Sequence, residues 1–153
     1  MRGQFTEKPA KIQWFTVQWD AAQLSWADFR GKVLGATDPT TAEEGSLRRI
    51  ILDDYKKLGL AERPFTGKNG VHASASPFEA MAERANWLGA DISKDVYGKT
   101  MLAAGLPMST IVQWTQDPQV PLADGSKGSL FDALEDTNAA ACLETSKRIA
   151  SRK

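Results

Sequence analysis

The stretch GKNGVHASASPFEAMAERANWL occupies residues 67–88 and contains the only histidine of the chain, His72. Its second half carries a helix start, because Ser76 suits an N-cap and is followed by proline, with glutamate at the third helical position. The run Gly70–Ala73 is short and extended in character. We therefore expect His72 near the edge of a β-sheet, directly before a helix. The apolar residues of that helix share one face: Phe78, Met81, Ala85 and Leu88.

A strand and two further helices are predicted upstream of this stretch. Residues 12–19 are rich in aromatic and branched side chains, as in a β-strand. A helix that begins after the N-cap candidate Ser25 should end at Gly35, because residues 36–45 hold Thr, Asp, Pro and Gly and suit an ordered loop. Apolar residues at helical spacing predict the second helix over residues 46–58.

The sequence after residue 90 is predicted to be wholly helical. The expected helices span residues 93–104, 107–116, 129–135 and 137–149, and Gly, Pro and Asp residues separate them. The only cysteine, Cys142, lies in the last of these helices. Its alanine-rich surroundings favour a small buried apolar group over a nucleophile.

The composition indicates one compact domain of 153 residues, with 42% hydrophobic and 25% charged residues. Nineteen basic residues balance nineteen acidic ones, so no overall field favours nucleic acid or an anionic membrane. No apolar run approaches the roughly 18 residues of a membrane span, and the amino terminus lacks an apolar secretory core. A single cysteine excludes an internal disulfide and fits the cytoplasm or another reducing intracellular compartment. With one histidine and one cysteine far apart in sequence, no protein metal site is expected.

A second informative stretch, LGATDPTTAEEGSLRR at residues 34–49, precedes the first. Together the two stretches resemble the nucleoside diphosphate kinase family over about residues 12–88, with the order of the blocks kept. The resemblance implies that His72 accepts a phosphoryl group and that the Glu83 carboxylate, supported by Ser74, orients its imidazole. It also implies that Asn69 contacts the sugar hydroxyl of a nucleotide. Two further residues fall on phosphate-contacting positions of the family: Thr37 and Arg48.

The same resemblance predicts the fold and the domain organisation. It implies an α+β protein whose residues 12–90 form a partial, ferredoxin-like (nucleoside diphosphate kinase-like) half-domain with few antiparallel strands. An arm, residues 1–11, precedes this half-domain, and a helical extension, residues 91–153, follows it. Because two strands alone are marginal in water, we expect either packing by the extension or a homo-oligomer or larger protein assembly.

The predicted activity is transfer of the γ-phosphoryl group from a nucleoside triphosphate to a diphosphate through a phosphohistidine, with Mg²⁺ arriving on the nucleotide. Neutral imidazole is nucleophilic near pH 7, and a carboxylate on one ring nitrogen fixes the tautomer that leaves the other free. The family's lysine and tyrosine have no counterpart here. Its second arginine falls on Gly31, and Arg30, one place away, can replace it only if the helix is re-registered. The alternative is therefore a non-catalytic structural subunit, with His72 an ordinary exposed histidine, Asn69 a turn residue and Arg48 a solvated cation.

Overall fold

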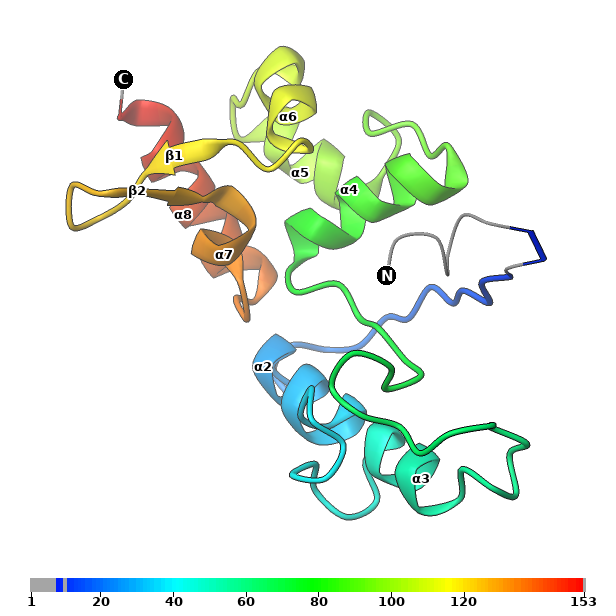
Figure 1. Ribbon diagram of the computed structural model, residues 1–153. Helices are drawn as coiled ribbons and strands as arrows, with labels where there is room; N and C mark the ends of the chain where they lie inside the picture. Colours follow the sequence, from blue (N-terminus) through cyan, green and yellow to red (C-terminus); the bar gives the residue numbers. More distant parts are fainter. Residues whose placement is uncertain (1–7, 10, 153) are drawn as a thin grey trace.

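The computed structural model describes residues 8–9 and 11–152. The fold is of the α+β class, with helices and a small two-stranded antiparallel sheet. Figure 1 shows the first helices and α4–α8 as two groups, joined by the segment that leads into α4. We call residues 20–75 the N-terminal part and residues 76–152 the C-terminal part. The elements in chain order are α2 (Trp26–Asp28), the π-helix η1 (Phe29–Leu34), α3 (Leu47–Asp53), α4 (Pro77–Leu88), α5 (Val96–Ala103), α6 (Met108–Trp114), β1 (Gln119–Pro121), β2 (Lys127–Ser129), α7 (Leu130–Leu134) and α8 (Ala139–Ser151).

The first helical segment begins and ends where the sequence predicts. The Ser25 hydroxyl accepts a hydrogen bond from the Asp28 amide at 3.0 Å, which caps α2. The segment continues as the π-helix η1 and ends at Gly35, whose φ of +94° favours glycine. A Cβ at Gly35 would also lie 2.4 Å from the Ser46 hydroxyl oxygen. A small set of buried residues holds this part together: Leu34, Pro39, Ala42, Ser46 and Leu52.

The helix predicted over residues 46–58 is shorter in the structure. Its N-terminal boundary is confirmed, but α3 ends at Asp53 and turns continue to Gly59. Residues 56–60 are exposed, so no tertiary packing supports further helical turns there.

The predicted start of α4 is confirmed. The buried Ser76 hydroxyl accepts a hydrogen bond from the Glu79 amide at 3.1 Å, and Pro77 occupies the first helical position. Phe78 and Met81 are buried, whereas Leu88 at the far end of the predicted face is exposed. The first two turns therefore carry the packing of this helix.

The main hydrophobic core lies entirely in the C-terminal part. The predicted domain boundary at residue 90 falls between α4 and α5, which both contribute to this core. Cys142 is also buried there, as expected for a small apolar group. The buried members are Phe78, Met81, Tyr97, Met101, Leu106, Ile111, Trp114, Val120, Leu130, Leu134, Cys142 and Ile149.

The prediction that the sequence after residue 90 is wholly helical is wrong, because β1 and β2 form an antiparallel hairpin. Val120 is the buried residue of β1 and pairs with Gly128. The hairpin turn contains Asp124 followed by Gly125, whose φ is +85°. An Asp-Gly pair between two short segments is a recognised hairpin signal.

The prediction of a strand over residues 12–19 is also wrong. These residues form no helix, and they pair with no strand in the described part of the chain. Large apolar side chains of this segment are at least half exposed, namely Ile12, Trp14, Phe15 and Val17. Strand propensity does not suffice without a partner that satisfies the backbone hydrogen bonds.

The run Gly70–Ala73 belongs to no sheet among the described residues and begins with a bend at Gly70, whose φ is +87°, so His72 does not lie at a sheet edge. Residues 8–9 and 11–152 thus lack the sheet of a ferredoxin-like half-domain. Most of the predicted arm, residues 1–11, lies outside the described residues.

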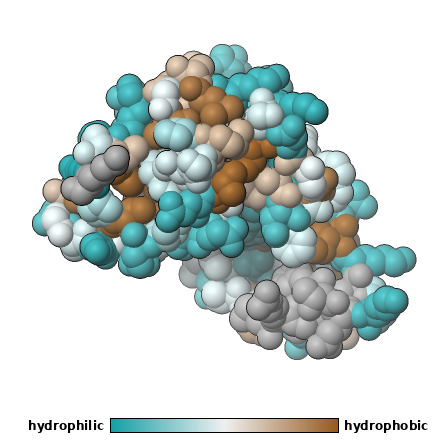
Figure 2. Space-filling model, turned by 90° about the horizontal axis from the view of Figure 1, so that it is seen from above, coloured by the Kyte–Doolittle hydropathy of each residue, from teal (hydrophilic) through white to brown (hydrophobic). Residues whose placement is uncertain are grey.

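The surface mixes apolar and hydrophilic residues, as the face in Figure 2 shows. Besides the extended segment before α2, Val96 and Trp87 are more than half exposed. None of the described helices has the length and apolar character needed to cross a membrane.

Candidate functional site

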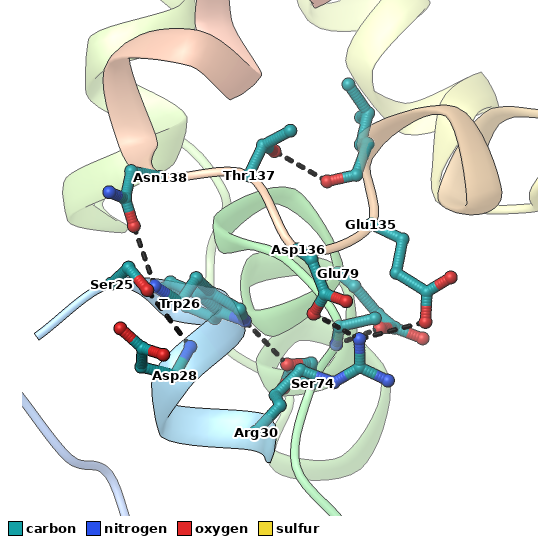
Figure 3. Close-up of polar contacts among 12 residues, drawn as sticks. Ser25, Trp26, Asp28, Arg30, Ser74, Glu79, Glu135, Asp136, Thr137 and Asn138 are labelled. Atoms are coloured by element: carbon teal, nitrogen blue, oxygen red, sulfur yellow. Dashed lines mark hydrogen bonds and ion pairs between the residues drawn. The ribbon is translucent and has the colours of Figure 1, made fainter. Parts of the chain in front are cut away.

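His72, Glu83 and Ser74 form a hydrogen-bonded chain. His72 Nε2 lies 2.7 Å from Glu83 Oε1, and the Ser74 hydroxyl donates to Glu83 Oε2 at 2.5 Å. Glu83 belongs to the second turn of α4, whose start is fixed by Ser76. The Ser74 carbonyl accepts a hydrogen bond from the Trp26 indole at 2.9 Å, which anchors the segment before α4 (Figure 3). The structure therefore brings together the three residues predicted for phosphoryl acceptance.

The hydrogen bond to Glu83 determines which nitrogen of His72 is free. A carboxylate can only accept a hydrogen bond, so in the neutral imidazole the proton lies on Nε2 and Nδ1 keeps its lone pair. The side chain of His72 is 68% exposed, whereas that of Glu83 is 27% exposed. The ring is thus accessible to a ligand, while the carboxylate that orients it is shielded.

The electrostatics of this pair favour a charged carboxylate. The hydrogen bond to Glu83 raises the pKa of His72 above its ordinary value, although partial burial opposes the shift. Burial raises the pKa of Glu83, but hydrogen bonds from His72 and Ser74 outweigh it, so the net pKa of Glu83 is lowered. Glu83 is therefore ionised near pH 7 and stabilises a positive charge on the imidazole.

Arg48 connects α3 to two loops of the N-terminal part. Its guanidinium donates to the Gly35 carbonyl at 2.7 Å through Nη1 and to the Val71 carbonyl at 3.1 Å through Nη2. Its Nε is buried and has no hydrogen-bond partner among the described residues. Burial, together with repulsion from Arg30, lowers the pKa of Arg48, though arginine stays protonated at neutral pH. Arg48 is thus a positive charge held in place, and its guanidinium keeps N–H groups that form no hydrogen bond with the described residues.

Asn69 and Thr37 lie next to each other. The Asn69 side-chain amide donates to the Thr37 carbonyl at 3.0 Å, across 32 residues of sequence. This bond ties the connection before His72 to the loop after η1. The two predicted ligand-contacting residues therefore come to the same place in the fold.

Arg30 is a further cation at this site. The π-helix η1 is re-registered relative to an α-helix, since its hydrogen bonds span five residues, as from the Gly35 amide to the Arg30 carbonyl at 3.1 Å. In Figure 3 the Arg30 side chain reaches Glu135 and Asp136, and its Nη1 lies 2.8 Å and 2.5 Å from their carboxylates. The sequence signal for Arg30 is its position, one place before Gly31, on which the second arginine of the nucleoside diphosphate kinase family falls.

A cleft of about 370 Å³ joins most of these residues, a size within the usual range for small-molecule sites. A neighbouring hollow of about 260 Å³ shares Arg30, Thr37, Arg48 and Glu135 with it. Glu83 and Ser74 do not line the cleft but lie behind His72. The sequence predicts the helix α7, but nothing in the sequence indicates that α7 lines the cleft. The lining residues are Arg30, Thr37, Arg48, Asn69, Val71, His72, Ala73, Ala75, Glu79, Phe131, Asp132 and Glu135.

The cleft has a basic side and an acidic side. Arg30, Arg48 and His72 come from the N-terminal part, while Glu79 and the α7 carboxylates come from the C-terminal part. Burial raises the pKa of Glu79, and the hydrogen bond that its carboxylate accepts from the Ala75 amide partly offsets this rise. The cationic residues of the N-terminal part therefore face carboxylates of the C-terminal part in this cleft, and Arg30 is already paired with two acids of that part.

No group of three or more His, Cys, Asp or Glu side chains is placed to hold a metal ion within the described ranges. The chain matches no family model, no curated protein and no solved structure. The roles given to His72, Glu83, Ser74, Asn69, Arg48 and Thr37 therefore stay predictions, which now rest on geometry.

Proposed function

We propose that this protein binds a nucleoside triphosphate in the cleft and accepts its γ-phosphoryl group on His72. The observation that carries the proposal is the His72–Glu83–Ser74 chain, which leaves Nδ1 free on an exposed ring beside Arg48 and Arg30. A nucleophile, a group that orients it and cations for the moving phosphoryl group are the parts such a reaction needs.

The first half-reaction is an in-line displacement. The Nδ1 lone pair of His72 attacks the γ-phosphorus, and the bond from phosphorus to the bridging oxygen breaks, so that the nucleoside diphosphate leaves with the electron pair. Glu83 stabilises the positive imidazole that forms through its bond to Nε2. In the second half-reaction a terminal oxygen of a nucleoside diphosphate attacks the phosphorus of the phosphohistidine, and the P–Nδ1 bond breaks, so that its electron pair returns to Nδ1 of His72.

The cationic residues would hold the phosphate oxygens. Arg48 retains unused donors beyond its two backbone bonds, and Arg30 uses only Nη1 toward its two acidic partners. Thr37 lines the cleft and the neighbouring hollow together with these two arginines, and Asn69 is hydrogen-bonded to Thr37. Mg²⁺ would be held by the phosphates and water, as is usual for this ion.

This proposal makes the chain a distant relative of nucleoside diphosphate kinases. It does not depend on a ferredoxin-like sheet, because the described helices and loops bring the side chains together without one. The family's lysine and tyrosine remain without counterparts, and losing such groups typically costs about 100-fold in rate each. We therefore expect phosphorylation of His72 to be slower than in the complete family site.

Incubation of the purified protein with γ-³²P-labelled ATP tests this function. We expect an acid-labile, alkali-stable label on wild-type protein and no label on His72→Gln, since the chain has no second histidine. Thr145→Ala, on α8 and outside the lining of the cleft, is the control and should label normally. A folded wild-type protein that acquires no label would remove the catalytic role. In that case a rise in melting temperature with nucleotide would still report binding.

A second candidate function is that of a structural subunit, and the exposed segment over residues 12–17 favours it. Trp14 is 57% exposed and Phe15 is 80% exposed, in a segment that pairs with no strand of the described residues. Such a segment can add to the sheet edge of a second copy or of another protein. Light scattering after size exclusion tests self-association: a monomer at micromolar concentration would rule out a stable homo-oligomer.

A further inference from the structure

We infer that α7 forms the nucleobase side of the cleft and selects guanine nucleotides, with Phe131 stacking on the base and the Asp132 carboxylate binding its Watson–Crick edge. This inference rests on the proposed function, because it names the nucleotide that the same cleft takes. It concerns residues of the C-terminal part that lie far from His72 in sequence.

The contacts of α7 indicate which end of the cleft would hold the phosphates and which end would hold the base. Glu135, at the end of α7, contacts Arg30, so this end lies at the phosphate-binding side. Phe131 lies four residues earlier, about one helical turn along the same face. A nucleotide whose phosphates lie at Arg30 and Arg48 would therefore extend its base along α7.

Phe131 is held in place while part of its ring lines the cleft. Its ring meets the Phe78 ring edge-to-face at 5.9 Å between centroids, and its amide donates to Asp117 Oδ1 at 2.9 Å. Apart from the His72 imidazole, it is the only aromatic side chain that lines the cleft among the described residues. An aromatic face in a nucleotide site is suited to base stacking.

The acidic side of the cleft suits a base with donors on one edge. Glu135 is paired with Arg30 and Glu79 accepts the Ala75 amide, whereas the Asp132 carboxylate has no hydrogen bond or ion pair in the described part of the chain. An ionised carboxylate only accepts hydrogen bonds. Guanine presents two adjacent donors, N1–H and the N2 amino group, which a carboxylate can accept together, and adenine presents only one amino group.

The α7 turn is also rigid enough to discriminate. The Ser129 hydroxyl donates to Asp117 at 2.7 Å and accepts the Asp132 amide at 3.1 Å, which fixes the first turn of the helix. A bidentate contact of this kind is expected to give about tenfold discrimination between bases.

Titration calorimetry with GDP, ADP, xanthosine diphosphate and inorganic tripolyphosphate tests the inference. Wild-type protein should bind GDP about tenfold more tightly than ADP. In Asp132→Asn the guanine preference should be lost and xanthosine diphosphate should bind better, because the asparagine amide can donate to the C2 oxygen of xanthine while its oxygen accepts N1–H. Asp124→Asn, an exposed aspartate of the hairpin turn, is the matched control and should leave all affinities unchanged.

Phe131→Leu keeps an apolar side chain against the core and removes the ring. This variant should bind the nucleotides several-fold more weakly, and its affinity for tripolyphosphate should not change. Equal affinities for GDP and ADP, unchanged in Asp132→Asn, would overturn the guanine assignment while leaving the proposed function intact. Absence of binding by every compound, tripolyphosphate included, would overturn the proposed function and this inference with it.

Discussion

Replacing Arg48 with methionine tests whether this guanidinium fixes the architecture of the site. The change removes two charged hydrogen bonds, to the Gly35 and Val71 carbonyls, and keeps most of the apolar stem. Hydrogen bonds from a charged donor contribute about 1.5–3 kcal/mol each, and partial access of water to the freed carbonyls reduces the loss. We expect the free energy of unfolding to fall by about 2–4 kcal/mol.

Arg49→Met provides the matched control. Arg49 is the next residue of α3 and makes an exposed ion pair with Asp53 at 2.9 Å, four residues along the helix. Such a pair contributes only about 0.3–0.5 kcal/mol. Both variants lose one positive charge, so the difference between them isolates the hydrogen bonds of Arg48.

Urea unfolding followed by tryptophan fluorescence gives both values. A domain of this size typically has about 5–15 kcal/mol of stability, so Arg48→Met should remain folded and show a lower midpoint with an unchanged slope. Equal midpoints for the two variants would show that the bonds of Arg48 do not support the fold, and its assignment as a fixed cation would be wrong.

Two further predictions concern the charges of the site. Glu83→Gln should lower the pKa of His72 toward its ordinary value, which the single imidazole resonance in an NMR titration reports. Because neutral imidazole attacks, the acid limb of the labelling rate should then move to lower pH. For folding, the raised pKa of His72 means that its protonated form adds stability that is fully present below about pH 6.5 while Glu83 stays ionised, and that is lost as pH rises through the folded-state pKa of His72. Glu135→Gln should tighten nucleotide binding about two- to fivefold, because it removes one of the two carboxylates paired with Arg30 and a charge of the same sign as the ligand. Calorimetry can measure this change, and Glu144→Gln, which removes another exposed acid, should not produce it. Weaker binding in Glu135→Gln would contradict this role of the carboxylate.

Local patterns in the sequence were sufficient for much of the helical structure. Ser76 and Pro77 predict the start of α4 because capping depends only on the next few residues. Residues 12–19 show the opposite case, since a strand depends on a partner elsewhere in the chain. The Asp124–Gly125 turn did carry a local hairpin signal, but the flanking segments are too short for clear alternation.

The contacts of the candidate site likewise fall into two kinds, those within one stretch of sequence and those between distant segments. His72, Ser74 and Glu83 lie on one loop and the helix that follows it, and the family resemblance in this stretch implies that they meet, as they do. The contact of Arg30 with Glu135 joins residues 105 positions apart, and no periodicity of the sequence indicates it. The α7 wall of the cleft therefore required the tertiary structure.

The confinement of the main core to residues from Phe78 onward has a consequence for motion. The segment that supplies Arg30 and Arg48 joins that core mainly through polar bridges, among them the Trp26 amide to Asn138 at 2.8 Å. Regions with few buried apolar contacts undergo local opening at lower free energy than the rest of a protein. Amide protons of α3 should accordingly exchange with deuterium faster than those of α8, and a bound polyphosphate spanning both arginines should slow them selectively.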